Sequence, residues 1–148
     1  MLGDSIKRAE IRNFCCLNNI DIMCLQETKL YDVTGPIMRS LAVSQDPTWA
    51  YLAADGSADG LLIGWNAQKW TWQSLVKGYH SLTAIFKDNV DSSMWALSNV
   101  YGPHSANERE RERESLWQEL RTFSYSFLDY GVWRVILILL GLFLKGKG

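Results

Sequence analysis

The sequence predicts an α/β fold, because helical and strand-like segments alternate along a chain that no repeat or linker divides. A helical segment at 6–18 leads directly into an apolar strand at 20–25. Further strand-like segments follow up to residue 101, and a second helix at 105–128 precedes a final apolar segment at 132–144. A chain of 148 residues is long enough to bury the core of one domain.

The first helix has a recognisable start, since Asp4 or Ser5 can accept hydrogen bonds from its first backbone N–H groups. We expect four apolar residues to face the core and four charged residues to face solvent. These are Ile6, Ala9, Phe14 and Leu17 on the apolar side, and Lys7, Arg8, Glu10 and Arg12 on the solvated side.

The middle of the chain predicts a short helix and five strands. Gly35 and Pro36 can open a helix that continues to about Leu41, since proline is tolerated at the first helical position. A glycine-containing turn at 55–60 separates the first two strands. The strands are expected at 49–53, 61–65, 70–76, 79–87 and 94–101.

The second helix begins with alternating charges at 108–114, which predict a solvated face. A buried stripe is expected from Leu116, Trp117, Leu120 and Phe123. The apolar segment at 132–144 is shorter than the roughly 20 residues that a membrane-spanning helix needs. A buried strand is the favoured interpretation of this segment, and a tail anchor is the alternative.

Composition excludes a strongly basic nucleic-acid-binding protein, because the net charge is −1 and no basic run is present. Three cysteines, two of them adjacent, predict reduced buried thiols in an intracellular protein rather than a disulfide framework. The N-terminus lacks the apolar centre of a secretory signal. These features do not distinguish nucleus from cytoplasm. The seven tryptophans lie mostly in strand patterns, which favours core packing over base stacking.

Two polar clusters follow apolar strands. The sequence Gln-Glu-Thr-Lys at 26–29 places Glu27 at a strand end, where a carboxylate can serve as an oxygen ligand for Mg²⁺. Tyr101 ends the strand at 94–101, so its hydroxyl can project toward a ligand, and Asn99 and His104 are candidates for binding phosphate. Each residue also has an interpretation without function. Glu27 can simply be a solvated residue at a strand end, Tyr101 a tyrosine with its hydroxyl in solvent, and His104 a solvated loop histidine.

Four segments in order resemble the endonuclease/exonuclease/phosphatase family, and in particular the endonuclease domains of plant LINE-type (non-LTR) retrotransposons. They are the helix start at 4–11, the strand and polar end at 20–29, the Gly-rich turn and strand at 56–66, and Trp-Ala-Leu-Ser-Asn-Val-Tyr-Gly-Pro at 95–103. The resemblance extends from residue 2 to about 121. It implies a magnesium-dependent hydrolase that cleaves phosphodiesters of nucleic acid, with Glu27 as the metal ligand and Tyr101 contacting the scissile phosphate.

The chain departs from this family in three places. The family's first strand, with its Asn, would precede Met1, and the family's second half has no counterpart. The segment 133–141 occupies the position of a strand that ends in Gly-Asp-Phe-Asn, yet it contains neither Asp nor Asn. We therefore expect a partial sandwich of this family's type, a mixed sheet with flanking helices, formed by residues 1–131. Residues 132–148 are expected to be a divergent apolar strand or tail.

These departures predict a fragment of the enzyme that is inactive as it stands. Two alternatives remain: a working phosphodiesterase completed by a partner chain, and a non-catalytic binding or interaction module that retains the sheet. A partial sandwich also leaves strand edges open, which predicts self-association through an exposed sheet edge. If the resemblance holds, Glu27 and Tyr101 should lie at the same end of the molecule.

Overall fold

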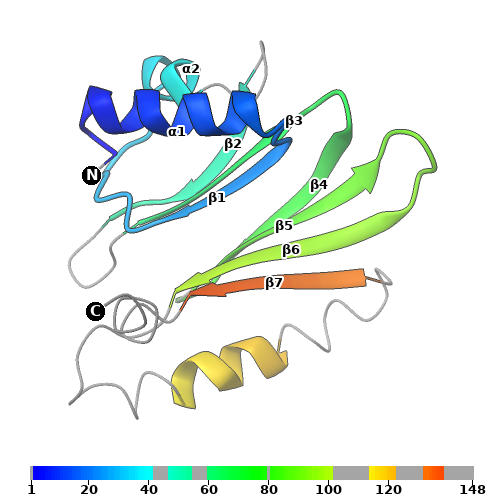
Figure 1. Cartoon of the computed structure of the whole chain (residues 1–148). Coiled ribbons are helices and arrows are strands. Elements are labelled where there is room, and N and C mark those ends of the chain that lie inside the picture. The colour runs from blue at the N-terminus through cyan, green and yellow to red at the C-terminus, as the bar shows by residue number, and fades with distance from the viewer. Residues whose placement is uncertain are drawn as a thin grey trace.

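The computed structural model describes residues 2–41, 47–54, 60–79, 81–101, 114–122 and 132–138. Within this part of the chain, two β-sheets pack face to face, with helices on their outer faces (Figure 1). The architecture confirms the predicted sandwich. The labelled elements have the bounds α1 Ser5–Leu17, β1 Ile22–Gln26, α2 Gly35–Leu41, β2 Pro47–Leu52, β3 Leu61–Asn66, β4 Trp70–Lys77, β5 Ser81–Asp88, β6 Met94–Tyr101 and β7 Val132–Ile138.

The first sheet is antiparallel, with the order β1-β3-β2. β3 is its central strand, and residues 61–65 of this strand are all buried. α1 and α2 cover the outer face of the sheet (Figure 1). Between helices and sheet lies a cluster of buried apolar side chains that includes Cys15, Met23, Met38 and Leu62. Strand β1 therefore has side chains packed on both faces while it forms one edge of the sheet.

The second sheet has the order β4-β5-β6-β7. Strands β4, β5 and β6 form an antiparallel meander, and β7 pairs with β6 in the parallel direction. A helix at 114–122 packs against the outer face of this sheet, where its residues Leu116 and Leu120 cluster with Val100. This packing confirms Leu116 and Leu120 as members of the predicted buried stripe.

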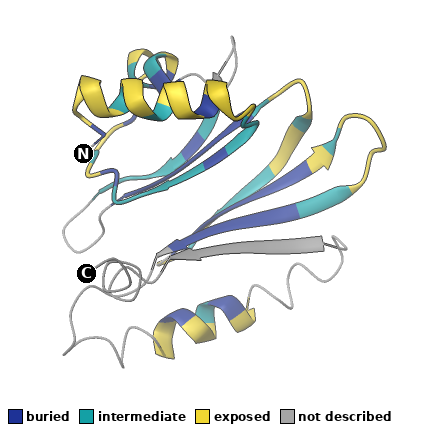
Figure 2. Cartoon of the chain, viewed as in Figure 1, coloured by how far each residue is buried: buried dark blue, intermediate teal, exposed yellow. Residues whose placement is uncertain are grey.

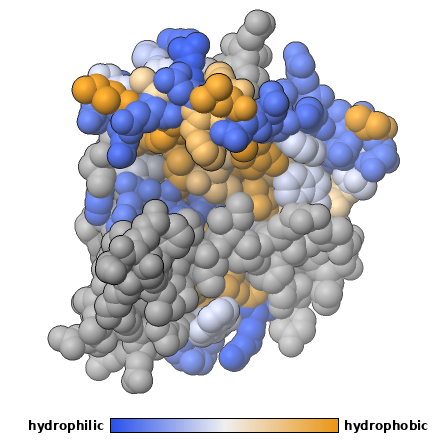
Figure 3. All heavy atoms as spheres, viewed as in Figure 1, coloured by the Kyte–Doolittle hydropathy of each residue, from blue (hydrophilic) through white to orange (hydrophobic). Residues whose placement is uncertain are grey.

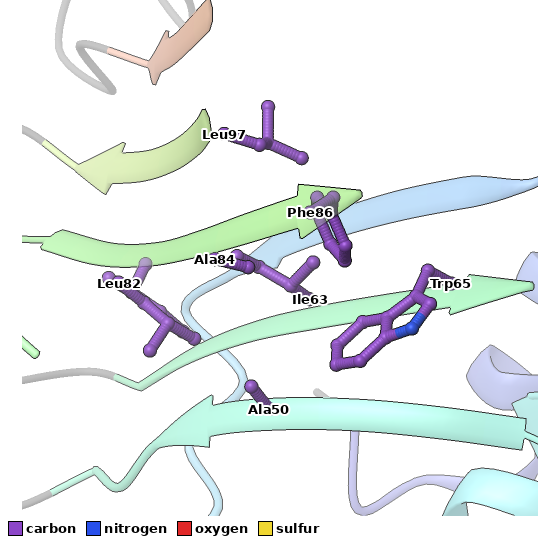
Figure 4. Close-up of a cluster of buried hydrophobic side chains, with 8 residues drawn as sticks. Ala50, Ile63, Trp65, Leu82, Ala84, Phe86 and Leu97 are labelled. Atoms are coloured by element: carbon purple, nitrogen blue, oxygen red, sulfur yellow. The ribbon is translucent and has the colours of Figure 1, made fainter. Parts of the chain in front are cut away.

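The main core fills the space between the two sheets (Figure 4). Trp65 from the first sheet and Phe86 from the second meet edge to face, with ring centroids 5.1 Å apart. Such aromatic pairs contribute about 0.5 to 1.5 kcal/mol beyond the area that they bury. Smaller side chains complete the contact, namely Ala50, Leu61, Ile63, Leu82, Ala84 and Leu97.

Helix α1 lies where the sequence predicts it, but its buried face is not the predicted one. Asp4 caps the helix by accepting a hydrogen bond from the N–H of Ile6 at 2.9 Å. Ile11 and Cys15 face the sheet instead, while most of the helix surface is exposed (Figure 2). The predicted apolar face is wrong for all four of its residues, because Ala9 is exposed and the side chains of Ile6, Phe14 and Leu17 are 70%, 61% and 82% exposed.

Arg8 was predicted to face solvent, and this is also wrong. Its guanidinium is half-buried and donates one hydrogen bond to the hydroxyl of Ser40 at 2.7 Å and another to the carbonyl of Leu2 at 2.8 Å. These bonds tie α1 to α2 and to the N-terminal residues. The polar contact thus fixes the rotation of α1 about its axis, so that Arg8, Ile11 and Cys15 share the inward side.

Several other expectations need correction or fall outside the described residues. Trp117 is 40% and Trp72 48% exposed, so neither is a core side chain, and the thiol of Cys16 is exposed. The predicted helix at 105–128 is described only at 114–122, while Phe123 and the turn at 55–59 lie outside the described residues. The final apolar segment forms a strand over Val132–Ile138. In the described part of the chain, no helix is long and apolar enough to cross a membrane.

Candidate functional site at the carboxyl ends of β1 and β6

A hydrogen-bonded pair of amides, the half-buried Gln26 and the buried Asn99, joins the carboxyl ends of β1 and β6. The side-chain amide of Gln26 donates to the side-chain oxygen of Asn99 at 2.9 Å and to the carbonyl of Val100 at 3.1 Å. Asn99 in turn donates to the carbonyls of Leu25 at 3.1 Å and Leu62 at 3.0 Å. The strand end that precedes Glu27 is therefore in direct contact with the strand end that carries Tyr101.

Asn99 is completely buried, and its amide is engaged by these three hydrogen bonds. It links two strands of the first sheet to one strand of the second. The geometry makes Asn99 a positioning residue between the sheets, since a direct contact with phosphate would require these bonds to open. An amide within the mostly apolar sequence of β6 was the signal for such a role, and sequence reasoning interpreted it as a ligand contact.

Glu27 follows β1 with a left-handed backbone, φ = 52°, and Lys29 has φ = 57°. This conformation is uncommon for residues other than glycine, and it concentrates at functional sites where the surrounding structure holds it in place. Thr28 stabilises this turn, because its side chain is buried and its backbone N–H donates to the carbonyl of Gly60 at 3.3 Å. The turn directs Glu27 away from the path of β1.

A cavity of about 210 Å³ lies beside the half-buried Glu27. Its walls combine polar and apolar groups from the first residues, from α1 and from β1, namely Leu2, Lys7, Ile11, Leu25, Gln26, Glu27 and Thr28. Gln26 and Glu27 thus both border one hollow. Sequence reasoning identified Glu27 but could not identify Lys7 as a neighbour of this hollow.

The backbone of Tyr101 ends β6 and lies opposite Ile138, the last residue of β7, in the parallel pairing. The tyrosine side chain and the whole of His104 lie outside the described residues. In the sequence, Ile138 is followed by Leu139, Leu140 and Gly141, so no acidic or amide side chain follows β7 directly. Among the described residues, no group of three or more histidine, cysteine, aspartate or glutamate side chains could hold a metal ion.

A second polar pair, which sequence reasoning missed, borders the same end of the first sheet. The hydroxyl of Tyr51, one residue before the end of β2, donates to the carboxylate of Asp32 at 2.8 Å. This hydrogen bond, with the negative charge of Asp32, raises the pKa of Tyr51 above its ordinary value. The phenol therefore remains protonated near neutral pH and acts as a donor.

Solved structures share this arrangement of sheets, although no family model and no curated protein matches the sequence. The human Nocturnin catalytic domain with bound sulfate aligns with a TM-score of 0.59 and 14% identity, over 80% of this chain and 52% of that chain. An endonuclease/exonuclease/phosphatase from Bacteroides vulgatus aligns with a TM-score of 0.55 and 15% identity, over 76% of this chain and 50% of that chain. The AP endonuclease LMAP from Leishmania major aligns with a TM-score of 0.51 and 22% identity, over 82% of this chain and 41% of that chain.

These similarities define the class of fold. The chain has the endonuclease/exonuclease/phosphatase fold in part, and it spans about half the length of the solved structures that it matches. The fold class predicted from the sequence is thereby confirmed.

Proposed function

We propose that this chain is a fragment of a magnesium-dependent phosphodiesterase that acts on nucleic acid and that it is inactive as it stands. In this proposal Glu27 binds the metal and Tyr101 contacts the scissile phosphate. The observation that supports it is the hydrogen bond from Gln26 to Val100 at 3.1 Å, which brings together the strand ends that precede Glu27 and carry Tyr101. An AP endonuclease among the matching structures supports the same class of substrate.

The metal is the weakest part of the site. Mg²⁺ is held by one or two carboxylates together with waters and substrate phosphates, and it gives up its hydration water reluctantly. Glu27 supplies one carboxylate, and the described residues form no three-membered ligand group around it. They therefore do not fit a complete metal centre, and we derive no catalytic step through a metal ion. What this chain's residues do is hold the two strand ends in register through Gln26 and Asn99.

A non-catalytic binding module is the second candidate. The intact packing between the sheets, where Trp65 and Phe86 are fully buried, favours it, because the sandwich core is formed although the ligand group is incomplete. Such a module would bind nucleic acid without a contribution from Glu27.

A titration with Mn²⁺, which has the same preference for oxygen ligands and can be followed by its paramagnetic resonance, tests the metal site. We expect weak binding that Glu27→Gln removes. Glu10→Gln, which neutralises an exposed carboxylate on α1, serves as the matched control and should leave the binding unchanged. Binding that survives Glu27→Gln would exclude Glu27 as the ligand.

Plasmid nicking in Mg²⁺ tests the second part of the proposal. We expect no turnover above background, because positioning of the nucleophile and stabilisation of developing charge each supply several kcal/mol of an enzyme's rate enhancement. Mg²⁺-dependent nicking that Glu27→Gln and Tyr101→Phe both abolish would show an active enzyme. Nucleic-acid binding that is unchanged by Glu27→Gln, with no Mn²⁺ site, would instead support the binding module.

A further inference from the structure

Two rows of paired residues cross the sandwich near the end where β1 and β6 finish. The rows are Leu25, Leu62 and Tyr51 in the first sheet, and Asn99, Leu82 and Lys77 in the second. At one end of the rows, Asn99 donates to the carbonyls of Leu25 and Leu62, as described above. At the other end, the ammonium nitrogen of Lys77 lies 5.6 Å from the centre of the Tyr51 ring. The sheets are thus joined by amides at one end and by a cation and a ring at the other.

Tyr51 offers a fixed ring. Its hydroxyl donates to Asp32 at 2.8 Å, and the backbone of Val33 also hydrogen-bonds to the phenol. The ring packs against the apolar cluster beneath α1 and α2. An ammonium within about 6 Å of an aromatic ring centre is attracted by the negative face of the ring. Lys77 is therefore held at a defined place, and less of its conformational freedom has to be lost when it binds a ligand.

The charge of Lys77 is available to an anion. The side chain is exposed, and among the residues that the structure describes no carboxylate lies within ion-pair distance of its ammonium. The neighbouring Asp32 accepts the hydrogen bond of the Tyr51 hydroxyl at the rim of the ring, whereas Lys77 lies over its face. An ammonium has three N–H donors and no acceptor. A phosphate, with its negative charge and several oxygens, is a suitable ligand.

The distance from the candidate site follows from the pairing. Each row spans two strand spacings of about 4.8 Å, so Lys77 and Tyr51 lie roughly 10 Å from the strand ends that precede Glu27 and carry Tyr101. One strand of a DNA duplex carries a phosphate about every 3.4 Å along the axis. A separation of roughly 10 Å therefore corresponds to about three nucleotides along one strand.

We propose that Lys77, supported by the ring of Tyr51, binds a backbone phosphate of a nucleic-acid strand that lies across the candidate site. This inference rests on the proposed nucleic-acid substrate and adds a second contact, about three nucleotides from the first. Phosphate contacts position a strand without reading its bases, so the contact carries no sequence preference.

A local contact of this kind suits the charge of the chain. The net charge is −1, so nucleic acid is not attracted by the protein as a whole and must be held by individual contacts. Figure 3 shows hydrophilic side chains at this end of the first sheet, beside the apolar surface below α1. A free phosphate ion would gain only the contact with Lys77. A polymer joins that contact to those at the candidate site, which favours nucleic acid over a small anion.

The salt dependence of binding tests the contact. A short fluorescein-labelled DNA duplex is titrated with the 148-residue chain at several KCl concentrations, in EDTA so that no metal ion contributes. Each neutralised phosphate contributes about −0.9 to the slope of log K against log salt. We expect Lys77→Gln to reduce the slope by about 0.9 and to weaken binding about eightfold at roughly 0.1 M salt.

Lys87→Gln is the matched control, because it removes an exposed positive charge at the other end of β5 and should leave the slope unchanged. A slope that Lys77→Gln changes no more than Lys87→Gln would overturn the proposal. An effect of Lys77→Gln on the binding of inorganic phosphate alone, with none on the duplex, would assign the residue to a free anion and would also overturn it.

Two variants of Tyr51 test the ring. Tyr51→Phe keeps the ring and should retain the affinity for the duplex. Tyr51→Leu removes the ring and should weaken binding about two- to fivefold, the range of a cation–π contact. Equal effects of the two variants would overturn the role of the ring.

The outcomes separate this inference from the proposed function. A slope that depends on Lys77, together with Mn²⁺ binding that Glu27→Gln does not affect, supports the phosphate contact and overturns the metal site. Mn²⁺ binding that requires Glu27, together with duplex binding that does not depend on Lys77, supports the proposed function and overturns the contact. A chain that binds no nucleic acid at any salt concentration would overturn both.

Discussion

The amide of Asn99 should contribute more to stability than any other polar side chain between the two sheets, and Asn99→Ala tests this. The substitution removes three hydrogen bonds and leaves the carbonyls of the half-buried Leu25 and the buried Leu62 without this donor. A buried polar group that loses its partner costs about 1 to 3 kcal/mol. We expect a total loss of about 2 to 4 kcal/mol in the free energy of unfolding.

Urea denaturation followed by tryptophan fluorescence measures this loss, and it should appear as a lower midpoint with an unchanged slope. Asn18→Ala is the matched control, because Asn18 is exposed and donates one hydrogen bond to the carbonyl of Phe14; it should change stability by less than about 0.5 kcal/mol. An equally small effect of Asn99→Ala would refute the role of this residue as a link between the sheets.

Asn99→Asp adds a pH signature to the same experiment. A charged carboxylate at this position would face two carbonyl oxygens in a buried site, so folding favours the protonated form and raises the carboxyl pKa above its unfolded value. A group with a raised pKa gives full stability below its unfolded pKa and loses it as pH rises through the folded pKa. The Asp variant should therefore be more stable in acid than near neutral pH, in contrast to the wild type.

Two further predictions concern the backbone near the site and the thiols. Gly60→Ala should destabilise the chain by about 1 to 3 kcal/mol, because Gly60 has φ = 92° and a methyl group there would collide with Thr28. Gly3→Ala is the control, since a methyl group at Gly3 would make only an ordinary van der Waals contact with Leu30 at 4.0 Å. Thermal melting of both variants measures the difference. Burial raises the pKa of Cys24 to about 12, so iodoacetamide at pH 8 should alkylate the exposed Cys16 first and the half-buried Cys24 more slowly. Equal alkylation rates of the two thiols in mass spectrometry would contradict this prediction.

Local sequence patterns were sufficient for the elements and their order, because strand alternation and turn residues act over short distances. The strand at 94–101 has the predicted bounds, and the strand at 61–65 extends by only one residue. The face of α1 could not be predicted in the same way. Two candidate faces existed on this helix, and the choice between them depended on Ser40, a hydrogen-bond partner of Arg8 that lies 32 residues further along the chain.

The candidate site, too, could be predicted from the sequence only where local patterns were sufficient. A carboxylate at a strand end is visible in the sequence, and this led to Glu27. The role of Gln26 and Asn99 depends on a contact between residues 73 positions apart, which exists only once the two sheets have packed. Sequence patterns alone therefore separate a polar residue from its apolar neighbours but do not distinguish a ligand contact from a buried link between strands.

The parallel pairing of β7 with β6 has a consequence for the order in which the molecule assembles. The meander of β4, β5 and β6 joins strands that are close in sequence, whereas Trp95 must find Val132 across a much longer connection. Closing longer loops costs more entropy, so β7 should dock last. During synthesis on the ribosome, β6 would then pass through a period as an uncovered sheet edge, and chaperones that recognise extended apolar segments would have their best opportunity to bind in that interval.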